Sequence, residues 1–164
     1  MYCKLLIIFI FSFMSILSSA QDQPFQKQIL AGYEINYFGK NSFVHGRFLK
    51  NNHIIETGIN YNFSDGFSDD PVIGIGLHYG YQVISSKKWK TSLGAEYRRQ
   101  KPLKIVNIQT LCYTTSVQYN YKSNWSLLSR IGYGVATERS ASDGSFDQFN
   151  NLTGSISLSC VYHL

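Results

Sequence analysis

The feature that most constrains this chain is an alternation of apolar and polar side chains with a period of two residues. It recurs in about eight stretches separated by turn residues. In the clearest stretch, residues 73–83, Ile, Leu, Val or Tyr at every odd position alternates with Gly, His or Gln. In the first stretch, residues 29–37, Leu30 is an apolar exception on the polar face. Helix signals are nearly absent. The alternation therefore predicts an all-β protein built from eight antiparallel strands in up-and-down order.

The first 20 residues have the three parts of a secretory signal peptide. Lys4 supplies the positive start, residues 5–17 form an apolar core, and Ser18 and Ala20 are the small residues before a cleavage point. Cleavage is expected before Gln21. This leaves 164 − 20 = 144 residues for one domain, residues 21–164. No later apolar stretch reaches the roughly 20 residues of a spanning helix.

Two kinds of barrel can close eight such strands. A soluble barrel, such as a lipocalin-like ligand-binding barrel, turns its apolar face inward, whereas a membrane barrel turns it toward lipid. Alternation alone does not choose between them. The identity and placement of the other residues do, since charged residues make up only 15% of the chain and aromatic residues another 15%.

The polar face of the predicted strands favours the membrane barrel. It is rich in Gly, Ser, Thr, Asn and Gln, which suit the crowded inside of a narrow barrel better than a water-facing surface. Glutamate, arginine and histidine residues fall in mid-strand on this face, and enclosed charges of opposite sign are expected to pair. The predicted interior polar network consists of Glu34, Arg47, Glu56, His78, Glu96, Arg98 and Arg130.

Aromatic residues on the apolar face gather toward both ends of the strands. Rings at two levels with aliphatic residues between them are typical of the interfacial girdles of membrane barrels. A soluble core gives no reason for this placement. The predicted girdle residues are Tyr37, Tyr61, Tyr81, Trp89, Tyr97, Tyr119, Tyr121, Trp125 and Tyr162.

The last stretch carries an apolar residue at every second position and ends on the strand: Ile156, Leu158, Cys160, Tyr162 and Leu164. It resembles the C-terminal insertion signal of bacterial outer-membrane barrels, read here as Ile156, Leu158, Tyr162 and Leu164. That signal usually ends in Phe or Trp, so Leu164 is a departure. The whole of residues 21–164 resembles the class of small eight-stranded bacterial outer-membrane β-barrels.

This resemblance implies a location and partners. The chain would be secreted, inserted by the barrel-insertion machinery with periplasmic chaperones, and surrounded by outer-membrane lipid. The tight basic turns at residues 50–52, 85–88 and 122–124 would be periplasmic, while loops 64–71 and 138–151 would be extracellular. Two further connections, at residues 39–42 and 100–104, are expected at the same end as these loops. Phe67, Phe146 and Phe149 in those loops are candidate anchors for a structural or adhesive contact. A lipocalin would instead carry a G-x-W motif, where this chain reads Gly32-Tyr33-Glu34.

Enzymatic activity is the alternative that the resemblance raises, because some barrels of this class modify lipid A. The deacylases among them carry a His-x-Ser element, which none of the four histidines of this chain matches. A site assembled across strands, such as His78 with Glu56 and a serine, stays open. The charged interior is interpreted as a static ion-paired plug, with a proton path or gated pore as the alternative.

The sequence predicts no cofactor, no metal site and no nucleic-acid partner. The net charge of +5 is spread over turns and strands rather than gathered on one face. Cys112 and Cys160 fall on opposite faces of their strands, so they are not expected to pair. The leading hypothesis is thus a non-enzymatic outer-membrane barrel with a closed, polar interior.

Overall fold

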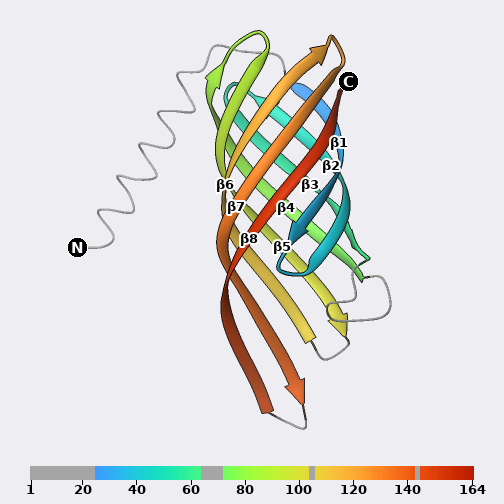
Figure 1. Cartoon of the computed structure of the whole chain (residues 1–164), viewed down its shortest axis with the longest axis vertical. Coiled ribbons are helices and arrows are strands. Elements are labelled where there is room, and N and C mark those ends of the chain that lie inside the picture. The colour runs from blue at the N-terminus through green and yellow to red at the C-terminus, as the bar shows by residue number, and fades with distance from the viewer. Residues whose placement is uncertain (1–24, 64–71, 104–105, 143–144) are drawn as a thin grey trace, which may run out of the picture.

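The strands of this chain close into a barrel (Figure 1). The computed structural model describes residues 25–63, 72–103, 106–142 and 145–164. Every neighbouring pair is antiparallel, and the last strand pairs with the first to close the sheet. The strands are β1 (Gln26–Asn36), β2 (Gly39–Lys50), β3 (His53–Asn62), β4 (Val72–Ser85), β5 (Trp89–Leu103), β6 (Val106–Lys122), β7 (Trp125–Ser142) and β8 (Ser145–His163). The predicted eight-stranded antiparallel up-and-down barrel is confirmed.

The two faces of the barrel wall differ as the alternation predicts. On β4, Ile73, Ile75 and Leu77 are 68%, 58% and 51% exposed on the outside of the barrel. The residues that alternate with them, Gly74, Gly76 and His78, are buried on the inside. Because large aliphatic side chains cover the outside, the barrel has its apolar surface where a soluble protein has its polar one.

The inside of the barrel is mainly polar, but it contains a small apolar cluster. Leu30, Phe43, Leu128 and Val161 are buried together there. Leu30 is the residue that breaks the alternation of the first stretch, and the cluster explains why. On β2, Phe43 and Leu49 face inward, whereas Val44 and Phe48 next to them face outward.

The strands differ greatly in length, and the difference corrects two predicted loops. Residues 138–151 are not a loop: β7 and β8 run to Ser142 and from Ser145, and they pair from Trp125↔Tyr162 to Ser142↔Ser145. Their ends project past the other strands as a long hairpin (Figure 1). Phe149 accordingly lies in β8. Likewise the predicted connection at residues 100–104 is mostly strand, since β5 ends at Leu103 and β6 begins at Val106.

Two ends of the barrel can now be distinguished. The turn end carries the short connections at residues 51–52, 86–88 and 123–124 and the C-terminus; the hairpin end carries the β7–β8 hairpin (Figure 1). Asn51 adopts φ 55°, a left-handed conformation that asparagine tolerates. At the hairpin end, β1 and β2 are joined through Tyr37 and Phe38 rather than through the predicted residues 39–42.

Some predictions concern residues outside the described part of the chain. These are the signal peptide at residues 1–20 and the loop at residues 64–71 with Phe67. Among the described residues there is no helix long and apolar enough to cross a membrane.

Candidate functional site: the enclosed polar network

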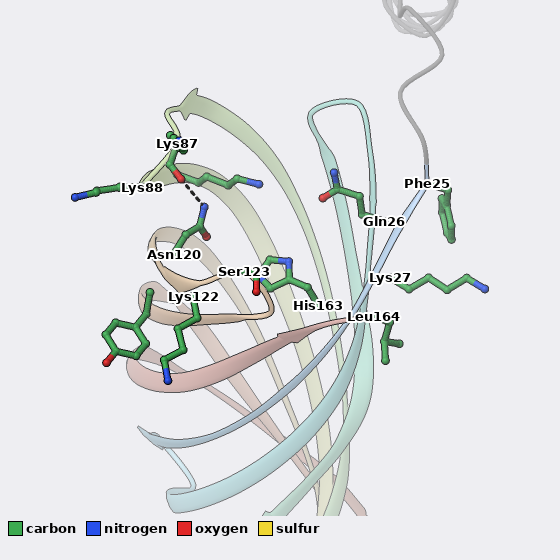
Figure 2. Close-up of a pocket in the computed structure, with 12 residues that line it drawn as sticks. Phe25, Gln26, Lys27, Lys87, Lys88, Asn120, Lys122, Ser123, His163 and Leu164 are labelled. Atoms are coloured by element: carbon green, nitrogen blue, oxygen red, sulfur yellow. Dashed lines mark hydrogen bonds between the residues drawn. The ribbon is translucent and has the colours of Figure 1, made fainter.

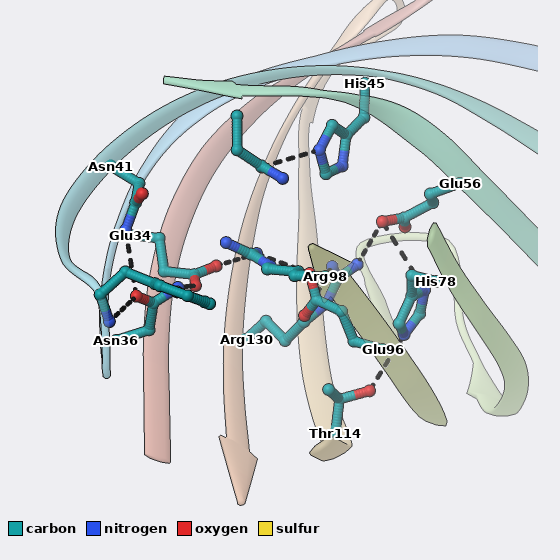
Figure 3. A network of polar contacts seen from close by, with 12 residues as sticks. Glu34, Asn36, Asn41, His45, Glu56, His78, Glu96, Arg98, Thr114 and Arg130 are labelled. Carbon is teal, nitrogen blue, oxygen red and sulfur yellow. Dashed lines mark hydrogen bonds and ion pairs between the residues drawn. The ribbon is translucent and has the colours of Figure 1, made fainter. Parts of the chain in front are cut away.

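Three glutamates and three arginines form one alternating chain of ion pairs inside the barrel, in the order Glu34, Arg98, Glu96, Arg130, Glu56 and Arg47. None of these six side chains is more than 3% exposed. Each charge thus has at least one neighbour of opposite sign, as enclosed charges require. Figure 3 shows Arg98 between Glu34 and Glu96.

The closest contacts lie around two carboxylates. Arg98 donates from Nε to Oε1 of Glu96 at 2.6 Å and also pairs with Glu34. Arg130 Nη2 donates to Glu56 Oε2 at 2.6 Å, while Arg47 Nε lies 3.2 Å from Glu56 Oε1. Arg47 continues the chain by donating to Gln118 Oε1 at 2.8 Å. Glu56 therefore holds two arginines at once.

The network connects strands that are far apart around the wall. Glu34 comes from β1, Arg47 from β2, Glu56 from β3, Glu96 and Arg98 from β5, and Arg130 from β7. Contacts that span the inside of a barrel tie its strands together independently of the hydrogen-bonded ladder. The seven predicted network residues, His78 included, all lie in this enclosed space.

His78 lies between a carboxylate and a hydroxyl. Its Nδ1 is 3.6 Å from Glu56 Oε2, and its Nε2 is 3.0 Å from Thr114 Oγ1 (Figure 3). The order hydroxyl, imidazole, carboxylate resembles a hydrolytic triad, with threonine in place of the serine considered from the sequence. However, His78 is 2% and Thr114 4% exposed, and Glu56 is already paired with two arginines. The Thr114 hydroxyl is therefore shielded from solvent.

Glycines on the inner face make the room that the histidines occupy. A Cβ at Gly94 would lie 2.7 Å from His78 Nε2 and 2.4 Å from the Tyr79 carbonyl oxygen. A Cβ at Gly58 would lie 2.5 Å from Cδ2 of His45, whose Nε2 is 3.1 Å from Asn60 Oδ1. A larger residue at Gly58 or Gly94 would therefore collide with a histidine ring, so glycine is required for the histidines to fit inside.

The interior around the network is filled rather than hollow. A cavity of about 10 Å³ lies beside Glu34, Glu96 and Cys112, about enough for one water molecule. Cys112 is buried and Cys160 is exposed, and neither forms a disulfide. Among the described residues no group of three or more His, Cys, Asp or Glu side chains is arranged to hold a metal ion.

At the hairpin end, Tyr37 joins the first turn to the projecting hairpin. Its hydroxyl donates to Glu138 Oε1 and accepts from Asn151 Nδ2 at 2.8 Å. The hydrogen bond to Glu138, with partial burial, raises the pKa of the Tyr37 hydroxyl. Tyr37 thus lies in the turn after β1 and bonds to the hairpin strands, and its place in an aromatic girdle stays a prediction.

The other predicted girdle residues lie on the outer face. At the turn end two pairs of rings are in contact across strands. The ring centroids are 4.6 Å apart for Trp89 and Tyr119, and 4.9 Å apart for Trp125 and Tyr162. Tyr61, at the other end of β3, is 44% exposed. Tyr81, Tyr97 and Tyr121 complete the set. Their role at a membrane interface stays a prediction.

The four residues of the predicted insertion signal also point outward or lie at the strand end. Ile156 and Leu158 are 64% and 61% exposed on β8, and Leu164 is 72% exposed. Tyr162 is half-buried against Trp125. Whether this segment acts as a signal stays a prediction.

Several network members were not singled out from the sequence. Gln118, Thr114 and Asn60 bond directly to the predicted charged residues or to the interior histidines. Gln100 Nε2 donates to Asn41 Oδ1 at 3.0 Å near the hairpin end. Their position on the polar face was the available signal, but uncharged polar residues are too common there to select particular ones.

Comparison with known proteins identifies the fold. Two de novo designed transmembrane β-barrels match at TM-scores of 0.59 and 0.56, each with 10% identity over 88% of this chain and 100% and 98% of theirs. Neisserial surface protein A matches at 0.50, with 15% identity over 87% of this chain and 99% of that one. The fold is that of a small outer-membrane β-barrel.

A second natural barrel agrees with this result. The outer membrane protein AlkL, solved in lipid bilayers, matches at a TM-score of 0.51 with 12% identity, over 88% of this chain and 92% of that one. At such low identities the likeness concerns the fold alone. No family model matches the sequence, and no curated protein matches it.

Proposed function

We propose that this protein is an integral protein of the bacterial outer membrane with a closed interior, secreted by a signal peptide cleaved before Gln21. The observation that carries the proposal is the inverted wall, with aliphatic side chains outside and ion pairs inside. In water the outer face would be one continuous apolar surface, far larger than soluble monomers expose. In a lipid bilayer, whose interior is apolar, such an outer face is favourable.

The test of location is fractionation followed by electrophoresis. The protein is expected in the detergent-extracted outer-membrane fraction, migrating differently before and after boiling because the folded barrel resists detergent. Recovery from the periplasm without detergent would contradict the proposal and favour the soluble ligand-binding barrel.

We also propose that the interior acts as a plug rather than a pore. The alternating chain of ion pairs crosses the barrel from β1 to β2 by way of β5, β7 and β3. Eight strands leave space for little beyond side chains. In planar bilayers the purified protein is expected to give no stable single-channel steps, and steady conductance of the unaltered protein would overturn this part of the proposal.

The projecting hairpin supports a structural or adhesive role at the cell surface. The pairing of β8 with β1 ends at Ile156, so the preceding residues of β8 have only β7 as a ladder partner. Phe149 and Leu152 in this segment are 61% and 73% exposed. An exposed strand edge with apolar side chains is a surface that another chain can bind.

A variant with polar replacements at the hairpin tests this role. Phe149→Ser with Leu152→Ser is expected to insert normally but to reduce adhesion or aggregation of intact cells. The matched control is Asn150→Ser, on the same strand. Equal adhesion of both variants and the unaltered protein would leave the hairpin without the proposed role.

A further inference from the structure

The turn end of the barrel opens into a cavity of about 710 Å³. Its lining includes five lysines that come from three different parts of the wall: Lys27, Lys87, Lys88, Lys90 and Lys122. Lys27 is the second residue of β1, Lys87 and Lys88 lie in the turn before β5, Lys90 lies in β5, and Lys122 ends β6. The cavity therefore brings together cations that are distant in the sequence (Figure 2).

Acidic side chains do not balance this charge. None of the residues that line the cavity has a carboxylate side chain, and no ion pair within the described chain includes one of the five lysines. The enclosed network, in contrast, matches every arginine with a glutamate. The five lysine ammonium groups thus outnumber the single α-carboxylate of Leu164, and the net positive charge around a concave surface concentrates anions.

Hydrogen bonds fix the floor of the cavity. Asn120 Nδ2 donates to the Lys87 carbonyl oxygen at 3.1 Å, and the Asn120 backbone N–H donates to the Lys88 carbonyl oxygen at 2.8 Å. These bonds hold the lysine-bearing turn against β6. Ser126 Oγ bridges Asn120 Oδ1 at 2.8 Å and His163 Nε2 at 2.7 Å. The floor is therefore a preorganised polar surface and not a fluctuating end of strands.

The lysines of the lining differ in direction and in burial. Figure 2 shows Lys27 and Lys88 pointing away from the opening in opposite directions. Lys90, in contrast, is half-buried, because it occupies the inner face of β5 two residues before buried Ser92. The ammonium group of Lys90 is partly removed from water, so it attracts an anion more strongly than a fully exposed lysine does.

We propose that the cavity at the turn end binds a phosphate-bearing anion, held by Lys87 and Lys90 with Asn120 and Gln26 as further amide groups in its lining. Lysines bind phosphate as point charges, and neutral amide donors complete its hydrogen bonds. The volume exceeds that of phosphate alone and suits a phosphate attached to a small polar group. A lipid headgroup and a soluble phosphate compound share this chemistry. The inference depends on the proposed membrane location only for the compartment that the cavity faces.

The experiment measures phosphate binding to the purified, folded protein in a neutral detergent. Inorganic phosphate is titrated at low ionic strength, and the fluorescence of Trp89, next to the lysine turn, is recorded. The test variant is Lys87→Gln with Lys90→Gln. The matched control is Lys40→Gln with Lys101→Gln, which removes two lysines from the hairpin end. Boiled and unboiled samples on a gel verify that every variant is folded.

Saturable binding that weakens at least about tenfold in the test variant, and not in the control, is the expected result. Added salt should weaken it too. Equal affinity in all three proteins, or equal loss in both variants, would overturn the proposal even if the protein is shown to reside in the outer membrane.

A second arm distinguishes the two sources of phosphate. The protein is placed in nanodiscs of a phosphate-free galactolipid with and without phosphatidylglycerol, and the inorganic phosphate titration is repeated. Competition by phosphatidylglycerol supports a lipid headgroup as the occupant. Unchanged binding in both discs supports a soluble phosphate compound. Loss of binding in both kinds of disc contradicts the proposal for the membrane-embedded protein.

Discussion

The inner and outer faces of the barrel wall are held by opposite kinds of interaction. On β4, Leu77 and Ile75 project outward with about half of their surface exposed, at 51% and 58%. Their neighbour His78, one residue along, is buried between Glu56 and Thr114. The two faces of this one strand therefore lie in different environments. The comparison shows that the outer face is stable only where its apolar side chains meet an apolar environment. The inner face is stabilised instead by ion pairs between glutamates and arginines.

The strongest way to break the inner face is to remove its central carboxylate. Glu56→Gln leaves Arg47 and Arg130 without their shared partner, and an uncompensated buried charge is expected to cost about 3–5 kcal/mol. Urea unfolding in phospholipid vesicles, followed by tryptophan fluorescence, measures the loss. Asp147→Asn is the control, because this carboxylate is exposed on the hairpin. Similar unfolding midpoints for the two variants would contradict a stabilising role for the network.

The outer face is broken by placing a charge in the middle of its apolar band. Leu77→Arg is expected to destabilise the folded barrel in vesicles by about 2–4 kcal/mol, since arginine is costly near the bilayer midplane. Val83→Arg, close to the turn end, is expected to cost about 0–1 kcal/mol. The same unfolding assay compares them. If position along the strand makes no difference, the outer face does not lie across a membrane.

Packing on the inner face gives a smaller effect. Gly94→Ala brings a methyl group against the Tyr79 carbonyl oxygen and the His78 ring, and overpacking of this kind costs about 1–3 kcal/mol. Gly154→Ala is the matched control, because its nearest heavy atom would be 3.6 Å away. A Gly94→Ala protein as stable as the control would show that the histidine moves aside at little cost.

The smallest effect on stability is expected in the β7–β8 hairpin, which projects beyond the closed barrel. Replacing residues 139–149 by a short turn shortens β7 and β8 beyond the barrel and leaves the ion-pair network intact. Barrel stability in the urea assay should change by less than about 1 kcal/mol, as for segments that bury little. A larger loss would mean that the projecting hairpin itself supports the barrel.

The alternation of residue types predicted the strands and their facing because a period of two is a property of every β-strand. It even marked Leu30 as an exception, and the structure gives the reason in a cluster with Phe43 and Val161. The charged residues of the interior were also identifiable, because charge in mid-strand is rare. Their order of pairing was not, since it depends on which strands face each other across the barrel.

The hairpin shows where sequence reasoning failed. Residues 138–151 are rich in Ser, Asn and Asp, which in a membrane strand would signal a loop. Beyond the bilayer a strand needs no apolar face, so polar composition does not end it. The dipeptide Asp143-Gly144 was the available signal, because Asp-Gly is typical of two-residue hairpin turns. The bonds from Tyr37 to Glu138 and Asn151 could not be predicted for the same reason, because both partners lie on strand segments that were taken for a loop.

The most direct test of the central claim measures what surrounds the outer face. A spin label is attached at Leu77→Cys in a chain carrying Cys112→Ser and Cys160→Ser, and the protein is reconstituted in vesicles. Collisions with oxygen, which partitions into lipid, are compared with collisions with a water-soluble nickel chelate. The account predicts high accessibility to oxygen and low accessibility to nickel. The reverse order would show that water covers this face and would contradict a membrane-spanning barrel.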